Sequence, residues 1–274
     1  MSRTPGKYGK RPPKRAAAIP LGSLLTGRVP AHSAAADYLA AMNGGWQMLG
    51  NDTEGDCAAV TWANARRLVT ATLGGVERYP TLDQVITVYR TQNPQFDPSG
   101  SADTNGPGSE ADGGMDLQTL FETLHKTPGP DGAQIVAFAQ VDPKNAAEVR
   151  AAIAIFGYVW TGTMVQQANE QQFADEQPWD YVRSSPVVGG HSILTGGYGK
   201  AVSDAPELGG DEKFVTWAAE TSFTDRFWRR EVDEAWAVLW PEHLGTRAFE
   251  QGIDQAALAA AYREITGRSL PSAA

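Results

Sequence analysis

The sequence contains one cysteine, Cys57, so no disulfide can form within the chain, and folding does not depend on an oxidising compartment. No apolar run approaches the roughly 20 residues that a membrane-spanning helix needs. The stretch Ala16–Leu25 is too short, and too interrupted by proline and glycine, for a secretory signal. These absences predict a soluble protein that is made in the cytoplasm and is not exported.

Basic residues are also scarce, 23 against 32 acidic ones, and they are unevenly placed. Residues 1–28 carry seven basic residues and no acidic one, which gives them a charge of +7. Because the whole chain has a net charge of −9, residues 29–274 carry −16. With four prolines, residues 1–28 are predicted to form a flexible basic arm. Such an arm could bind nucleic acid, an acidic partner surface or the acidic body of its own chain.

The length of 274 residues and the 42% hydrophobic content allow one substantial core, or two lobes that share a cleft. The eight tryptophans follow no period, and several lie in apolar runs. We therefore expect them to pack in the core rather than to form a carbohydrate-binding surface.

Cys57 ends a glycine-rich loop, and the run 58–68 that follows it reads as a helix. The unpaired N–H groups and the dipole at a helix N-terminus favour thiolate, whereas a lone cysteine is otherwise often an inert core residue. Glu54 and Asp56 add negative charge that opposes the thiolate. Asp56 is predicted to be the N-cap of the helix.

His191 lies in the apolar, glycine-bounded run 187–199, which predicts a strand that starts at the histidine. The next predicted strand, 213–220, would pair with it across the polar loop 200–212 and supply a group that orients the imidazole. The alternative is a core histidine whose nitrogens bond to the backbone. Asn51 precedes Cys57 by six residues and could donate its amide to an oxyanion beside the thiol.

This order of residues resembles the papain-like cysteine peptidases, with a cysteine-to-histidine gap of 134 residues, inside the roughly 130–150 of that family. Gly113-Gly114 and the helical run after it resemble the family's double glycine and second helix, and 149–165 resembles the helix and strand that enter its sheet lobe. The resemblance implies Cys57 as nucleophile, His191 as general base and acid, and Asn51 in the oxyanion hole. Asn51 stands where the family usually has glutamine.

The group that orients the histidine departs further from the family. Where the family has asparagine, this chain has Thr216 in the segment Thr216-Trp217, so Thr216 or the nearby Glu220 would orient His191. The resemblance implies no cofactor and no metal. A metal bound by the acidic residues of the 93–114 loop is an alternative, although their spacing does not follow a calcium-loop pattern.

The predicted fold class is α+β, a papain-like two-lobe fold with a helical lobe that carries Cys57 and an antiparallel β lobe that carries His191. We predict a basic flexible arm at 1–28 and a papain-like domain at 29–248. Its helical lobe spans about 29–130 and its sheet lobe about 131–248. A C-terminal helix and tail are predicted at 249–274.

The predicted function is a cysteine hydrolase, a peptidase or isopeptidase that works by thiolate acyl transfer. The loop before Cys57, the Gly-Gly-His run at 189–191 and the Val-Thr-Trp run at 215–217 together most resemble papain-like proteins of bacteriophages and bacteria. This resemblance would place the protein in the host cytoplasm or in the virion. Its partners would then be a peptide or protein substrate such as a cell-wall peptide, and phage structural proteins or nucleic acid through the basic arm. The alternative is a catalytically silent papain-like fold that serves as a virion or interaction component.

Overall fold

The computed structural model describes residues 3–14, 18–26, 34–199 and 210–271. Its centre is a seven-stranded sheet with the order β2-β7-β3-β4-β5-β6, and β1 pairs with β4. Every pairing in this sheet is antiparallel. The strands are β1 (Ala36–Asp37), β2 (Ala137–Val141), β3 (Val159–Gln166), β4 (Val187–Tyr198), β5 (Gly210–Thr216), β6 (Ala219–Thr224) and β7 (Val232–Leu239).

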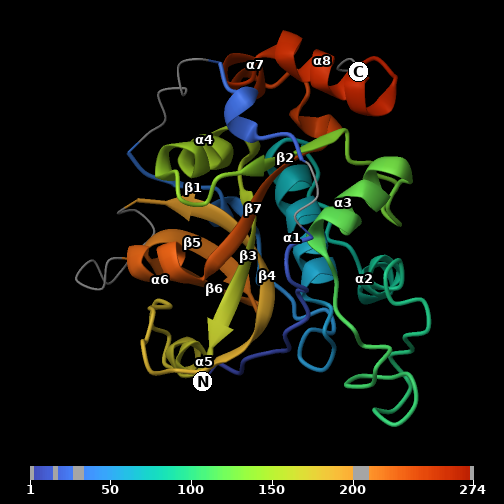
Figure 1. Ribbon diagram of the computed structural model, residues 1–274, viewed down its shortest axis with the longest axis vertical. Helices are drawn as coiled ribbons and strands as arrows, with labels where there is room; N and C mark the ends of the chain where they lie inside the picture. Colours follow the sequence, from blue (N-terminus) through green and yellow to red (C-terminus); the bar gives the residue numbers. More distant parts are fainter. Residues whose placement is uncertain (1–2, 15–17, 27–33, 200–209, 272–274) are drawn as a thin grey trace.

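Helices cover both faces of the sheet (Figure 1). The helices of one side are α1 (Cys57–Thr72), α2 (Leu82–Tyr89) and α3 (Leu117–Lys126). Those of the other side are α4 (Ala146–Phe156), α5 (Gln167–Ala174) and α6 (Asp225–Glu231). The chain continues into α7 (Arg247–Gly252) and α8 (Gln255–Thr266). The α+β class with an antiparallel sheet is therefore confirmed.

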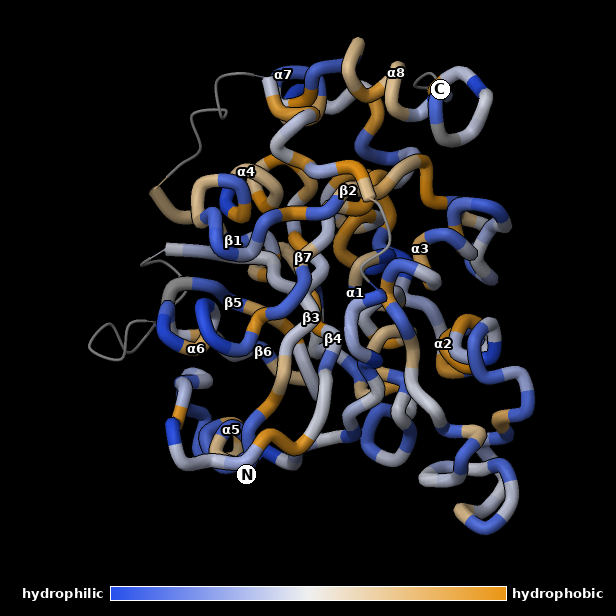
Figure 2. The backbone as a smooth tube through the Cα atoms, viewed as in Figure 1, coloured by the Kyte–Doolittle hydropathy of each residue, from blue (hydrophilic) through white to orange (hydrophobic). Residues whose placement is uncertain are grey.

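The sheet separates two hydrophobic clusters because alternate residues of a strand point to opposite faces. On β3, Trp160 packs towards α1 and α3, whereas its neighbour Val159 packs towards α4. All eight tryptophans are buried, which confirms that they serve the core. Figure 2 shows hydrophobic stretches along the inner strands and a largely hydrophilic α6.

The helix α1 begins at Cys57, as predicted, and is buried over almost its whole length. Asp56 occupies the N-cap position, but its side chain makes no capping hydrogen bond, so the predicted capping role is wrong. Among the described residues, neither of its two buried carboxylate oxygens has a hydrogen-bond partner. By contrast, Thr81 and Asp116 cap α2 and α3 through their side chains.

Two strand predictions around the site need correction. The strand that holds His191 begins four residues earlier, at Val187. The predicted strand 213–220 is in fact the end of β5, a two-residue turn and the start of β6. The turn residues Trp217 and Ala218 have φ values of 45° and 60°, a left-handed conformation that suits a tight hairpin. Most of the predicted loop 200–212 lies outside the described residues.

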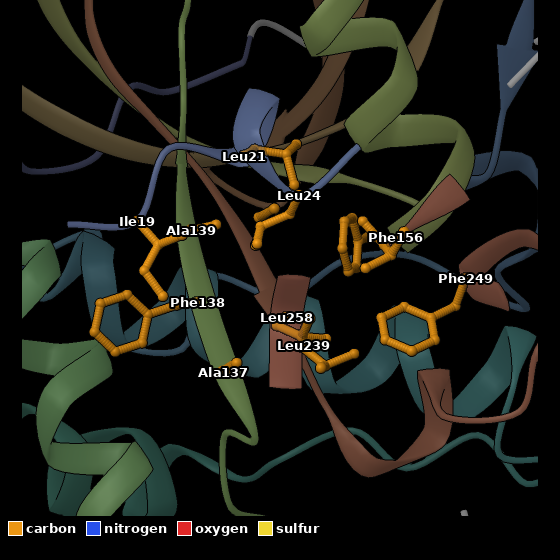
Figure 3. A pocket seen from close by; sticks show the side chains of 12 residues that line it. Ile19, Leu21, Leu24, Ala137, Phe138, Ala139, Phe156, Leu239, Phe249 and Leu258 are labelled. Carbon is orange, nitrogen blue, oxygen red and sulfur yellow. The ribbon is translucent and has the colours of Figure 1, made fainter. Parts of the chain in front are cut away.

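Residues 18–26 lie against β2 and the C-terminal helices. Pro20 forms a bridge with Gln140, and Leu25 with Ile253. Apolar side chains that include Leu21, Leu24 and Phe249 line a small pocket of about 20 Å³ there (Figure 3). All the residues that line this pocket have apolar side chains. None of the described helices is both long and apolar enough to cross a membrane.

Candidate active site

The start of α1 and the strand β4 bring Cys57 and the neighbourhood of His191 together. The hydroxyl of Thr61 donates to the Cys57 carbonyl over 2.8 Å, and Ser192 donates to the Thr61 hydroxyl over 3.1 Å. The indole N–H of Trp160 donates to Ser192 over 2.8 Å. This buried chain of hydrogen bonds joins the first turn of the cysteine helix to the residue after His191.

His191 is 1% exposed, and its Nε2 lies 2.6 Å from the hydroxyl oxygen of Thr216. Glu220 is engaged elsewhere, because it accepts from the Trp46 indole at 2.9 Å and pairs with Lys213 at 2.6 Å. Of the two predicted orienting residues, Thr216 is thus the one against the imidazole. The ring of Trp217 lies 4.8 Å from that of His191, centre to centre.

The second imidazole nitrogen, His191 Nδ1, is buried and has no hydrogen-bond partner among the described residues. The thiol of Cys57 and the imidazole are therefore not hydrogen-bonded in this structure. With Nε2 held by Thr216, Nδ1 is the nitrogen left to accept a proton.

Burial keeps both reactive groups neutral. It raises the pKa of Cys57 to about 12, with a further rise from the negative charge of Asp56. The backbone N–H groups of Ser192 and Gly9 and the charge of Lys10 act in the opposite direction on the pKa of the thiol. Burial alone lowers the pKa of His191 to about 3. Both shifts favour a neutral thiol and a neutral imidazole over a thiolate–imidazolium pair.

The cover over the site is the chain's own N-terminal segment, residues 3–14. Its backbone forms hydrogen bonds with the backbone of the loop at Asn51, of Met115 and of the strand β4 at Gly190. These bonds are Lys7 N to Asn51 O (2.6 Å), Lys10 N to Gly190 O (3.0 Å), Met115 N to Gly9 O (2.6 Å) and Arg11 N to Met115 O (2.8 Å). The segment lies across the site as an extended peptide would.

Gly9 is the point of closest approach. A Cβ atom at this residue would lie 1.6 Å from the carbonyl oxygen of Gly55, two residues before Cys57. Only glycine lets the two backbones meet at this distance. Nearby, the Tyr8 ring contacts the rings of His191 and Trp217, and its hydroxyl donates to Glu170 over 2.6 Å.

Asn51 is buried, and its side-chain amide donates to the carbonyl oxygens of Lys7 (3.2 Å) and Glu54 (3.1 Å). The amide therefore already binds a main-chain carbonyl of the peptide that lies in the site. The sequence predicted Asn51 as a donor but could not show that the N-terminal segment supplies the acceptor.

The N-terminal segment contacts the acidic body of its own chain, which is one of the three partners predicted for the basic arm. Lys10 forms ion pairs with Asp233 and Glu234. We did not predict that Tyr8, Gly9 and Lys10 lie in the site. The opposite charges of arm and body were the one signal in the sequence that favoured such a contact.

The loop before Cys57 carries buried carboxylates. Burial, together with the charges of Asp112 and Asp52, raises the pKa of Glu54 to about 7. Burial also raises the pKa of Asp56 well above its ordinary value. Asp112 orders the loop, because it accepts from Gly55 N and the Tyr89 hydroxyl at 2.9 and 2.6 Å. In the described part of the chain, no three acidic, histidine or cysteine residues are grouped so as to hold a metal ion.

No protein-family model and no curated protein matches the chain. Among solved structures, xylellain, a cysteine protease from Xylella fastidiosa, matches 87% of this chain and 98% of its own. The TM-score is 0.60 at 14% sequence identity. Procathepsin B S9 from Trypanosoma congolense matches 85% of this chain and 86% of its own, with a TM-score of 0.60 at 11% identity. The chain therefore has the fold of the papain-like cysteine proteases.

Proposed function

We propose that the protein is a papain-like cysteine hydrolase, a peptidase or isopeptidase that acts by acyl transfer through Cys57. The observation that carries the proposal is that a peptide main chain already lies in the site. It is hydrogen-bonded to Asn51, to Met115 and to Gly190, the residue before His191. A site that holds a peptide backbone beside a thiol and an imidazole has the parts that acyl transfer from a peptide requires.

In the proposed reaction, the thiol of Cys57 gives its proton to His191 Nδ1 as its sulfur attacks a substrate carbonyl. The C–N bond then breaks, the leaving amine takes the proton from His191, and a thioester remains on Cys57. Water hydrolyses the thioester, and the thiol is restored. Asn51 and the Cys57 backbone N–H would donate to the oxyanion.

Thr216 would hold His191 through Nε2. When the imidazole donates from Nε2 to the threonine hydroxyl, Nδ1 is left unprotonated and ready to accept the thiol proton. A hydroxyl can also donate, so Thr216 selects the tautomer less strictly than the amide oxygen of an asparagine would.

The silent fold is the second candidate, and a specific observation favours it. The thiol has a raised pKa and is not hydrogen-bonded to His191 while the N-terminal segment covers the site. A role in a phage virion, with structural proteins or nucleic acid bound through the arm, would then be the function. The link to phage rests on the resemblance of three short motifs, the loop before Cys57, the Gly-Gly-His run at 189–191 and the Val-Thr-Trp run at 215–217. Any partner of the arm would compete with the contacts to the body.

Thiol alkylation separates the two candidates. We expect Gly9→Ala to displace the N-terminal segment, because its Cβ would clash with the Gly55 carbonyl oxygen. In full-length protein that carries this substitution, we expect iodoacetamide to alkylate Cys57 with an apparent pKa below the free value of about 8.5. When His191→Ala is added to the Gly9→Ala protein, we expect the pH dependence of alkylation to become that of a free thiol. A profile that His191→Ala leaves unchanged supports the silent fold.

A further inference from the structure

Lys10 is buried in an unusual way for a lysine. Its side chain is 0% exposed, and its Nζ lies 2.9 Å from Asp233 Oδ2 and 3.2 Å from Glu234 Oε1. Lysine is almost never fully buried unless it is paired. The pocket that receives it, formed by Gly162, Asp233 and Glu234, is called the Lys10 pocket below.

The walls of the Lys10 pocket fit a long basic side chain. Glu234 on β7 is 2% exposed, and its Oε2 accepts from the Trp236 indole at 2.8 Å, which fixes the carboxylate. Its other oxygen, Oε1, has no further hydrogen-bond partner in the described chain. On the neighbouring strand β3, a Cβ at Gly162 would lie 2.3 Å from Lys10 Cε, so this glycine makes the room that the lysine stem occupies.

The charge of Glu234 makes the Lys10 pocket selective. A buried carboxylate that loses its only cation is strongly unfavourable, whereas a matched cation offsets the cost of its burial. When the N-terminal segment leaves, Glu234 and Asp233 lose Lys10. A peptide that brings another ammonium or guanidinium group restores the pair, but an apolar or acidic side chain does not.

The position of the pocket links it to the reactive centre. The residue before Lys10 is Gly9, which contacts Gly55 and whose backbone faces the Cys57 thiol. A side chain in the Lys10 pocket therefore belongs to the residue next to the one that covers the thiol.

We propose that the Lys10 pocket is a specificity subsite for a lysine or arginine side chain of the substrate, adjacent to a glycine that lies against Cys57. This proposal rests on the proposed hydrolase function, since it names the class of peptide that the same site would take. Glu234 is the residue that determines the preference, and Asp233, which is 30% exposed, assists it.

Peptide binding tests the subsite without requiring turnover. The protein is the full chain with Gly9→Ala, and the probe is a fluorescent peptide with the sequence of residues 4–13. Peptides with norleucine in place of Lys10, or with alanine in place of Gly9, are the comparisons. By fluorescence anisotropy we expect the norleucine peptide to bind roughly tenfold or more weakly. The alanine peptide is the matched control and should not bind, because it carries the clash with Gly55.

The protein variant Glu234→Gln keeps an oxygen for the Trp236 indole and removes only the charge. We expect this variant to bind the lysine peptide more weakly by a similar factor and to bind the norleucine peptide as tightly as its parent does. Its melting temperature should stay within a few degrees of that of its parent. Norleucine and lysine peptides that bind equally well overturn the subsite, as does a Glu234→Gln protein that still prefers lysine. Lysine-selective binding without hydrolysis of any peptide refutes the hydrolase and leaves the subsite standing.

Discussion

The substitution Gly9→Ala should open the site of the full-length protein. The alanine Cβ would lie 1.6 Å from the Gly55 carbonyl oxygen, and the nearest contacts of that atom are all backbone atoms. Backbone on both sides cannot move aside as a flexible side chain can, so the N-terminal segment must leave the site. The body of the protein loses no side chain, and its two hydrophobic clusters do not include Gly9.

The size of the effect follows from the pKa of Cys57. Under the N-terminal segment the pKa of Cys57 is about 12, whereas an exposed cysteine has a pKa of about 8.5. At pH 7.5 the fraction of thiolate should then rise about a thousandfold or more when the site opens. Better access of the reagent to the sulfur adds to this factor.

The assay is the rate of iodoacetamide alkylation, followed by intact-mass spectrometry. Cys57 is the only cysteine, so one added group reports on one atom. The matched control is Gly45→Ala, because a Cβ at Gly45 meets nothing within 4 Å. We expect the control to react as slowly as the parent protein. Equal rates for the parent and for Gly9→Ala would refute the reasoning, since the segment could not then be what keeps the thiol unreactive.

Further predictions concern the carboxylates and the orienting residue. Because burial raises the pKa of Glu54 to about 7, the folded protein keeps a proton that the unfolded chain has lost, and stability falls as pH rises from about 4.5 to 7. Glu54→Gln should remove this loss of stability and raise the free energy of unfolding at pH 8 by about 1–3 kcal/mol, a range reduced for solvent screening. Urea unfolding at pH 5 and at pH 8 measures the free energy of unfolding of both proteins. The prediction is contradicted if the free energy of unfolding of the variant depends on pH as that of the parent does. In the Gly9→Ala background, Thr216→Val should lower kcat for peptide hydrolysis by roughly 10- to 100-fold with little change in KM, since the imidazole loses its partner at Nε2. Thr216→Asn should restore most of kcat, and a valine variant as active as its parent shows that Thr216 does not orient His191.

The sequence predicted the parts of the fold that have strong local signals. The helix that starts at Cys57 and a C-terminal helix within 249–274 have clear apolar patterns, and both are present. The turn at Trp217 and Ala218 was missed, because neither residue is a usual turn former and tertiary contacts hold them at positive φ. Trp217 packs against Phe173, Trp179 and His191, contacts that no local pattern reveals.

The sequence predicted which residues form the site, but it did not predict that the N-terminal segment covers them. Cys57, His191 and Asn51 followed from local pattern and spacing together with the resemblance to the papain-like family, and the choice between Thr216 and Glu220 followed from that resemblance alone. Which of the last two faces the imidazole depends on the hairpin turn, which places Glu220 on the next strand. The cover over the thiol depends on a close approach between Gly9 and Gly55, residues 46 positions apart. Such contacts between distant segments follow from the folded shape and have no signature in either segment alone.

The measurement that tests the central claim most directly is mass-spectrometric detection of an acyl-enzyme. The Gly9→Ala protein would be mixed with a peptide that contains a glycine beside a lysine, quenched in acid after a short time, and digested. The account predicts a peptide acyl group on Cys57 and the accumulation of cleaved peptide. It also predicts the loss of both products in the Gly9→Ala/Cys57→Ser and Gly9→Ala/His191→Ala proteins. Cleavage that persists without Cys57, or an open and reactive thiol that forms no acyl-enzyme with any peptide offered, would contradict the account.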